Sequence, residues 1–142
     1  MSAWLKIEPV YEAILRYVKN EGIKVYHRKI KGGAGGYFDV KKCIITIDES
    51  AKGKVAGCYY LLHEKKHYDD WRVGKFPYFF RGFDDGYNEK NLQMVIDAEM
   101  SAIIGAHKEL KKWGIDYQPS EMSEGGLNET IIFWKKHYFG VV

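Results

Sequence analysis

The chain has little of what builds disulfide frameworks, membrane spans or secretion signals. Only two cysteines occur among its 142 residues, and no CxxC spacing joins Cys43 to Cys58. Both are therefore predicted to be buried free thiols, not a disulfide or a ligand pair. No stretch approaches the roughly 18 apolar residues that cross a bilayer, and the N-terminus lacks the apolar core of a signal peptide. These absences favour a soluble, cytoplasmic protein.

Charge of one sign is also scarce. The net charge is +3, from 22 Lys and Arg against 19 Asp and Glu, which is too small to indicate a nucleic-acid partner. The glycine-rich stretch "KGGAGGY" is followed by neither a helix nor Lys-Ser/Thr, so it does not predict a phosphate-binding loop. With 46% hydrophobic and 15% aromatic residues, the chain has the composition of one globular domain over 1–142, with a tail segment from about 116.

Local patterns predict an α+β fold. "GIKVYHRKI" and "YFDVKKCIITID" are rich in β-branched and aromatic residues, which favours a small sheet of about three strands with the last one at 43–48. Helical spacing and end signals predict the remaining segments, in this order: a helix at about 8–20, a helix that begins after Asp48 or Ser50 and runs to about 71, a loop at 72–88, a helix from Asn88 to Gly114, a polar link at 116–128, and an amphipathic terminal segment.

The stretch "LLHEKKH" carries the HExxH pattern. On a helix, His63 and His67 differ by about 40° and about 6 Å of rise, so both imidazoles can reach one tetrahedral ion. Glu64 lies about 100° from His63, where its carboxylate can accept a proton from metal-bound water. A surface helix with ordinary polar side chains is the alternative. The apolar and aromatic residues 59–62 form the turn before the histidines and cover all sides of the helix there, which predicts a buried helix instead.

A third ligand is predicted on the long helix after Asn88. An apolar stripe runs along one face of that helix, and Glu99 falls about 20° from its centre. A carboxylate in such a stripe must be neutralised, protonated or bound to a cation. Asp97 is the nearest competitor for the role of third ligand, but it lies about 140° from the stripe. Its side chain is therefore expected to face solvent or to contact a side chain that binds the metal. Zn²⁺ held by His63, His67 and Glu99 is the resulting hypothesis.

These residues carry a family resemblance over about 8–114. The order of first helix, hairpin sheet with "GYFDVKKCIITID", HExxH helix, irregular loop and helix with "IDAEMSAIIGAHKEL" resembles compact gluzincin-type metallopeptidases. That group includes the minigluzincins and related phage and prokaryotic zincin-like proteins. The resemblance implies a zincin-like fold, zinc bound by His63, His67 and Glu99, water activated by Glu64, and an edge strand at 43–48 that pairs with extended substrate.

The predicted function is therefore a zinc-dependent metallopeptidase in which Glu64 assists the attack of zinc-bound water on a peptide or protein substrate. Four residues are candidates for a contact to a metal-binding side chain or for a hydrogen bond to the transition state, and they are His107, Asp97, Tyr87 and His137. Some minigluzincins are held latent by their C-terminal segments. The resemblance therefore suggests that the apolar tail covers the cleft, while a terminal helix that simply completes the fold is an equal alternative.

Three other function classes stay open. The first is a zinc-bound but non-hydrolytic regulatory or interaction module of phage or prokaryotic origin. It is suggested by Lys65 and Lys66 inside the motif and by Ile103, where many relatives carry an Asp that orients a ligand histidine. The second is a nucleic-acid-binding domain that uses the lysine pairs and the aromatic loop "FPYFFRGF". The third is a structural domain without metal.

Overall fold

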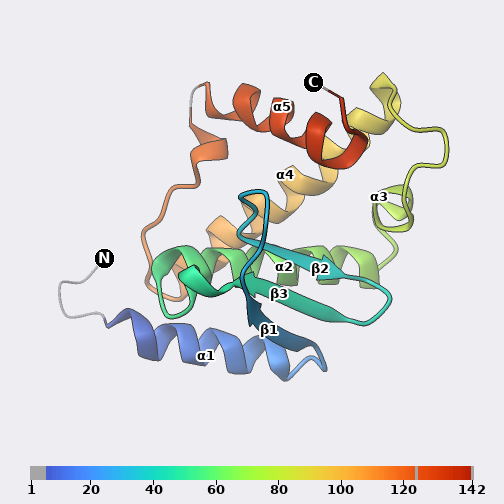
Figure 1. Ribbon diagram of the computed structural model, residues 1–142. Coiled ribbons are helices and arrows are strands. Elements are labelled where there is room, and N and C mark those ends of the chain that lie inside the picture. Colours follow the sequence, from blue (N-terminus) through green and yellow to red (C-terminus); the bar gives the residue numbers. More distant parts are fainter. Residues whose placement is uncertain (1–5, 124, 142) are drawn as a thin grey trace.

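The chain forms an α+β fold in which helices surround a small mixed sheet (Figure 1). The computed structural model describes residues 6–123 and 125–141. Within them the helices are α1 (Ile7–Lys19), α2 (Val55–Arg72), α3 (Pro77–Arg81), α4 (Glu89–Lys112) and α5 (Gly126–Phe139), and the strands are β1 (Lys24–Arg28), β2 (Gly36–Asp39) and β3 (Ile44–Asp48). Two short 3-10 helices, η1 (Glu49–Ala51) and η2 (Ser120–Met122), precede α2 and α5.

The sheet has the order β1-β3-β2, with β1 parallel and β2 antiparallel to β3. The prediction that 43–48 is an edge strand is therefore wrong, because β3 is the central strand and β1 and β2 are the edges. The physical reason lies in its composition. The run Ile44-Ile45-Thr46-Ile47 is the most apolar of the three strands, and residues 45–47 are buried, which suits a strand paired on both sides.

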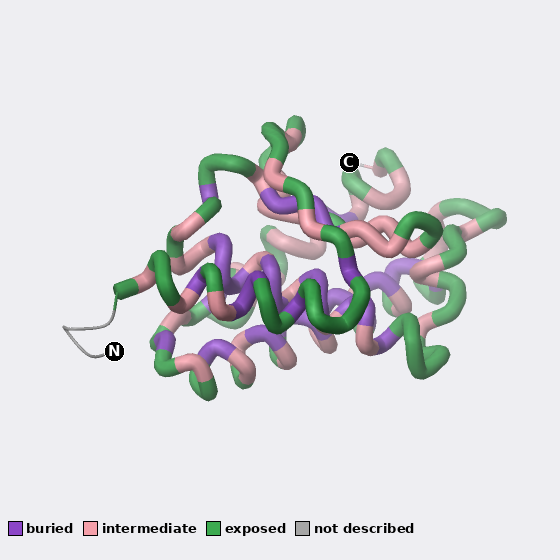
Figure 2. Tube along the Cα trace, turned by 90° about the horizontal axis from the view of Figure 1, so that it is seen from below, coloured by how far each residue is buried: buried purple, intermediate pink, exposed green. Residues whose placement is uncertain are grey.

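The inner face of the sheet packs on α2, and α1 lies beside both (Figure 1). The shared core is formed by side chains with no exposed surface, which include Ile14, Val18, Ile45, Leu61 and Leu110. Figure 2 shows buried positions along the inward sides of the helices and exposed positions on the outward sides. This core holds α2 rigidly under the sheet.

Helix α4 crosses α2 at close range. A Cβ built on Gly105 would lie 2.8 Å from Cγ of Lys66, so the stem of this lysine rests directly on the glycine backbone. Near the end of α2, Ser101 Oγ donates a hydrogen bond of 2.7 Å to Asp70 Oδ2. These contacts fix the spacing of the two long helices.

A second, smaller core lies between α4 and α5. Its buried members are Val95, Ile103 and Trp134, and aromatic residues from α3, the loop after it and α5 pack around them. Helix α3 occupies part of the predicted loop 72–88, and it begins at Pro77, which the first turn of a helix accepts because the missing N–H has no partner there. The described part of the chain contains no helix that is long and apolar enough to cross a membrane.

Both cysteines are free, as predicted, but only Cys58 is buried. Cys43 is only partly buried, at the margin of the core, so the prediction that it is fully buried is wrong. It ends the turn that leads into β3 and adopts a left-handed backbone conformation with φ of 54°. A residue in a turn remains close to solvent even when its neighbours in the sequence are apolar.

Candidate metal centre

Helices α2 and α4 bring His63, His67 and Glu99 together. Each offers one ligand atom, and these atoms all lie within 4.8 Å of one another. Nε2 of His63 is 3.6 Å from Oε1 of Glu99, and Nε2 of His67 contacts the same oxygen. His67 and Glu99 are buried, and the side chain of His63 is 12% exposed. Two imidazoles and one carboxylate in this arrangement could hold a metal ion.

Position along α4 explains why Glu99 and not Asp97 lies in this group. Glu99 is surrounded on the helix by the fully buried Val95, Ala102 and Ile103, as the apolar stripe predicts. Asp97 is exposed and accepts a hydrogen bond of 2.9 Å from Nε2 of Gln93. The helical period alone therefore separates the two acidic residues.

The hydrogen bonding of this group of three side chains is incomplete. Among the described residues, Nδ1 of His67 is buried without a hydrogen-bond partner, and Oε1 of Glu99 is buried with only the two imidazole Nε2 atoms near it. Burial raises the pKa of Glu99, but the neighbouring His67 and His63 outweigh it and hold the pKa of that carboxyl well below its usual range. An ionised carboxylate that faces two imidazoles is a donor set for a cation.

Aromatic side chains also contact both histidines. The hydroxyl of Tyr59 lies 3.3 Å from Nδ1 of His63, and the ring of Phe79 stacks on His67 at a centroid distance of 5.3 Å. Ile103 is fully buried in the second core, so it takes no part in these contacts. The four-residue spacing of Tyr59 and His63 is a signal that sequence reasoning could have used, because it places both on one helix face.

Glu64 lies beside the group and under the sheet. It is buried, and a Cβ built on Gly36 would lie 3.5 Å from Cγ of Glu64, so the backbone of β2 passes directly over its side chain. Burial raises the pKa of Glu64 to about 7, while His63 lowers it and Glu99 raises it. The carboxyl therefore stands between the histidine pair and an edge strand.

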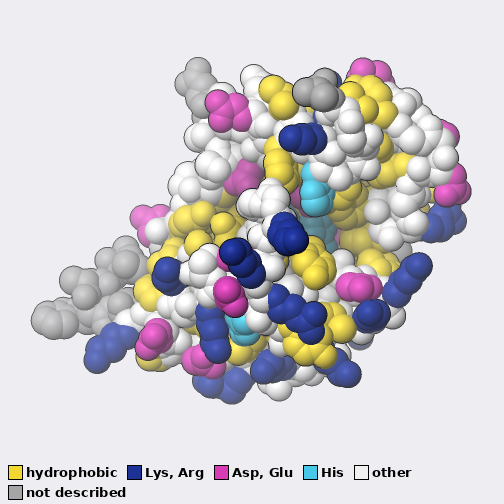
Figure 3. All heavy atoms as spheres, viewed as in Figure 1, with side chains coloured by type: hydrophobic (Ala, Val, Ile, Leu, Met, Phe, Trp, Pro, Cys, Tyr) yellow, Lys and Arg dark blue, Asp and Glu magenta, His cyan; other side chains and the backbone are white. Residues whose placement is uncertain are grey.

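A cleft of about 510 Å³ opens above these residues. Its walls are formed by the glycine-rich loop 33–36 with the start of β2, by the faces of α2 and α4 that carry the histidines and Glu99, and by helices α3 and α5. Figure 3 shows histidine side chains in the hollow between the sheet side and the upper helices. Four of the lining residues are carboxylates, Glu64, Glu99, Glu121 and Glu129, and none of those described there is Lys or Arg. The cleft of this basic chain is acidic and rich in aromatic rings.

The four other candidate residues are scattered. Nδ1 of His107 lies 3.0 Å from the carbonyl oxygen of Tyr117, and Tyr87 packs edge-on against Phe139 outside the cleft. Asp97 faces solvent, as described above. Of the four, only His137 lines the cleft. The structure does not bring His107, Tyr87 or Asp97 to the group of His63, His67 and Glu99.

Tyr138 is a cleft residue that sequence reasoning missed. It lines the cavity, and its ring packs on Phe79 at 5.4 Å, next to His67. Burial, with Glu99 and Glu64 nearby, raises the pKa of Tyr138 well above its usual value, so its hydroxyl remains a hydrogen-bond donor. Its position depends on how α5 docks, and the amphipathic pattern of the tail carries no information about that.

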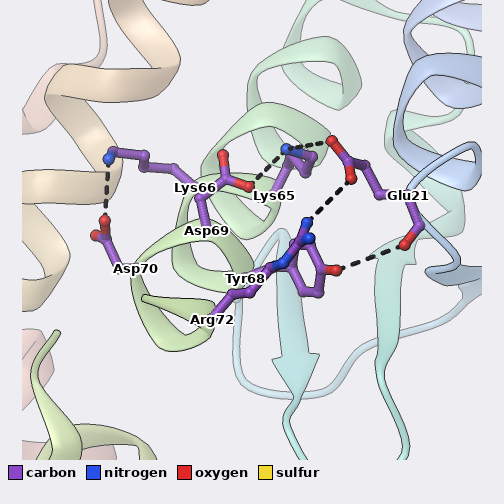
Figure 4. A network of polar contacts seen from close by, with 7 residues as sticks. All are labelled: Glu21, Lys65, Lys66, Tyr68, Asp69, Asp70 and Arg72. Carbon is purple, nitrogen blue, oxygen red and sulfur yellow. Dashed lines mark hydrogen bonds and ion pairs between the residues drawn. The ribbon is translucent and has the colours of Figure 1, made fainter. Parts of the chain in front are cut away.

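The two lysines inside the motif do not line the cleft, and Figure 4 shows each of them beside a carboxylate. Nζ of Lys65 lies 2.6 Å from Asp69 and 3.7 Å from Glu21, and Nζ of Lys66 lies 2.9 Å from Asp70. Both charges are therefore compensated by carboxylates outside the metal group. The presence of lysine at these positions places no positive charge at the candidate site.

The C-terminal segment lines the cleft and also completes the fold. Helix α5 contributes His137 and Tyr138 to the cleft wall, and it buries Trp134 in the second core. Latency through this segment stays a prediction.

The comparisons of the chain with family models, curated proteins and solved structures found no match.

Proposed function

We propose that the chain is a zinc-dependent metallopeptidase with a zincin-like arrangement of sheet and helices. The observation that carries the proposal is the buried group of His63, His67 and Glu99 with Glu64 beside it at the floor of an open cleft. Two nitrogen ligands and one carboxylate oxygen suit Zn²⁺, and catalytic zinc sites combine three protein ligands with one open position. The open side of this group faces the cleft.

Zinc, when bound there, lowers the pKa of water and polarises a carbonyl oxygen. The residues of the chain supply the proton transfers. Glu64 accepts a proton from the attacking water and then donates it to the nitrogen that leaves the broken amide bond. The side chain of Glu64 is buried beneath β2, and the two lysines that follow it on α2 pair with other carboxylates.

Strand β2 is the element that we propose to align the substrate. It pairs with β3 on one side only, and Gly36, Tyr37 and Phe38 line the cleft. The backbone of an edge strand offers free N–H and C=O groups to an extended peptide. A peptide paired there would pass directly over Glu64, because Gly36 lies above its side chain.

Helix α5 acts in this proposal as a fixed wall. Departure of the helix would expose Trp134 and the apolar side chains of α3 and α4 that pack around it, at a cost in buried apolar area. The aromatic residues Phe133 and Tyr138 on this wall, with Phe79 and Phe80 from α3, favour substrates with apolar side chains near the bond that is cleaved.

The test combines metal content with peptide cleavage. Wild-type protein should bind about one zinc per chain and cleave members of a diverse peptide library under zinc-replete conditions. Glu64→Gln should retain zinc and lose cleavage by roughly 10²-fold or more, because the amide keeps the shape but cannot accept the proton. Glu99→Ala should lose zinc, as measured by elemental analysis.

Asp97→Ala is the matched control, since it removes a carboxylate two residues away on the same helix and should keep both zinc and cleavage. Zinc that is lost from the Asp97 variant and kept by the Glu99 variant would reverse the ligand assignment. Zinc bound without any cleavage by wild-type protein would instead support the non-hydrolytic module.

A further inference from the structure

The small net charge of the chain conceals a strong segregation. Residues 24–54, which span the sheet and its flanking turns, contain eight Lys and Arg residues and three Asp and Glu residues, a net charge of +5. The whole chain carries +3, so the remainder carries −2. Figure 3 shows dark blue Lys and Arg side chains gathered over the side of the molecule where the strands lie in Figure 1.

The positive charge of this segment is not compensated locally. Among the described residues, none of its eight basic side chains forms an ion pair. Two of its three acidic side chains are occupied by backbone groups. Asp48 accepts hydrogen bonds from the N–H groups of Ile30 and Ser50, and Asp39 accepts one from Lys42. The basic groups are therefore free to bind an external anion.

The outer face of the sheet also presents two tyrosine rings. Tyr26 on β1 and Tyr37 on β2 are both in register with Thr46 on β3, so the two rings flank this residue on one face. They are 38% and 48% exposed, whereas Thr46 between them is only 3% exposed. Two strand spacings separate the rings by about 10 Å.

Cations and rings are interleaved on this face. Lys24 and Arg28 are the exposed neighbours of Tyr26 along β1, and the Arg28 guanidinium lies 4.9 Å from the centroid of the Tyr26 ring. A flat surface with exposed rings and uncompensated cations offers stacking surfaces for bases and partners for phosphates. In the part of the chain that the structure describes, the outer face of the sheet carries strands and turns and no helix that could enter a duplex groove.

We propose that the outer face of the sheet is a binding site for single-stranded nucleic acid. Bases stack on Tyr26 and Tyr37, and Lys24 and Arg28 neutralise phosphates between them. The site lies outside the metal group and shares only Tyr37 with the lining of the cleft. Its binding of nucleic acid does not require the peptidase activity. It also differs from the aromatic loop 76–83, which lies on the other side of the cleft with α3.

The test uses the full-length protein and a fluorescently labelled single-stranded oligonucleotide of about 12 nucleotides, with binding followed by anisotropy. Tyr26→Ala should weaken binding roughly tenfold, since a base loses its stacking partner. The affinity should fall with added salt, with a slope of log K against log salt of about −0.7 per phosphate contacted.

Tyr78→Ala is the matched control. Tyr78 is 49% exposed, and the Arg81 guanidinium lies 4.6 Å from its ring centroid. It therefore repeats the Tyr26–Arg28 pair on α3, away from the sheet, and its loss should leave oligonucleotide binding unchanged. Circular dichroism of both variants should match that of wild-type protein, because both side chains lie on the surface.

Equal affinities of the Tyr26 and Tyr78 variants would overturn the proposal, as would the absence of oligonucleotide binding at low salt. Binding to anionic phosphatidylserine vesicles without binding to the oligonucleotide would overturn it in favour of a lipid surface. Tighter binding of duplex than of single-stranded competitor would also overturn it, because paired bases cannot stack on the rings. Lys24→Glu with Arg28→Glu should abolish binding if the proposal holds.

Discussion

Helix α2 carries two groups of buried or half-buried charged side chains that differ in one respect. In the lysine network of Lys65, Lys66, Asp69, Asp70 and Glu21 (Figure 4), each ammonium group has a carboxylate partner. In the metal group of α2 and α4, Nδ1 of His67 has no hydrogen-bond partner among the described residues, and the only groups near Oε1 of Glu99 are the two imidazoles. The first group is complete, and the second lacks a component.

The difference supports the proposal that the metal group, and not the lysine network, binds a ligand. A buried polar atom without a partner costs about 1–3 kcal/mol, so an incomplete group lowers the stability of the fold unless a ligand completes it. The lysine network incurs no such cost, and it contacts nothing in the cleft. Both groups contain ionisable residues on one helix, so the satisfaction of hydrogen bonds, and not charge alone, distinguishes the candidate site.

The largest effect that sharpens this comparison is stabilisation by zinc. Zinc at about 1,000 times its dissociation constant should raise the free energy of unfolding by about 4 kcal/mol, because it binds the folded ligand set. Urea unfolding with zinc and with a chelator measures the difference. His67→Ala should abolish the zinc-dependent part. Equal stabilisation of this variant and wild-type protein would show that zinc binds elsewhere.

A smaller effect is expected from Asp70→Ala in the lysine network. Asp70 is 1% exposed and accepts hydrogen bonds from Lys66 and Ser101. Its removal leaves both donors without a partner and should cost about 2–3 kcal/mol in urea unfolding. Zinc should still raise the free energy of unfolding of this variant by as much as it raises that of wild-type protein. A variant that loses the zinc increment as well would mean that the two groups are coupled.

The smallest effect is expected from Lys65→Met. The Lys65 ammonium lies 5.2 Å and 5.7 Å from the ring centroids of Tyr17 and Tyr68, and the apolar side chain of methionine can contact the same rings. The carboxylates left behind, Asp69 and Glu21, are partly exposed and stay hydrated. The free energy of unfolding should therefore change by less than about 1 kcal/mol. A loss as large as that of the Asp70 variant would contradict the distinction between exposed and buried partners.

Local periodicity was sufficient to predict much of the helical part of the site. The four-residue spacing of His63 and His67 and the apolar stripe around Glu99 place these residues correctly, because a helix converts spacing directly into direction. The ion pairs Lys65–Asp69 and Lys66–Asp70 follow the same rule, since their partners are four residues apart.

Features that depend on long-range pairing were not predictable in this way. The central position of β3 requires a parallel partner from β1, twenty residues earlier in register, and no turn signal encodes that pairing. The positions of Tyr138 and His137 depend on the docking of α5 against α3 and α4. Whole-chain charge was equally uninformative about the sheet face, because acidic residues elsewhere cancel the excess there.

The close crossing of α2 and α4 at Gly105 has a consequence for metal selectivity. Two candidate ligands come from α2 and the third from α4, so the separation of the helices sets the radius of the ion that all three can reach together. A side chain at position 105 would meet the stem of Lys66 and widen that separation. In the proposed metal site, discrimination between small and large divalent ions would thus depend on a glycine that belongs to neither the candidate ligand set nor the cleft wall.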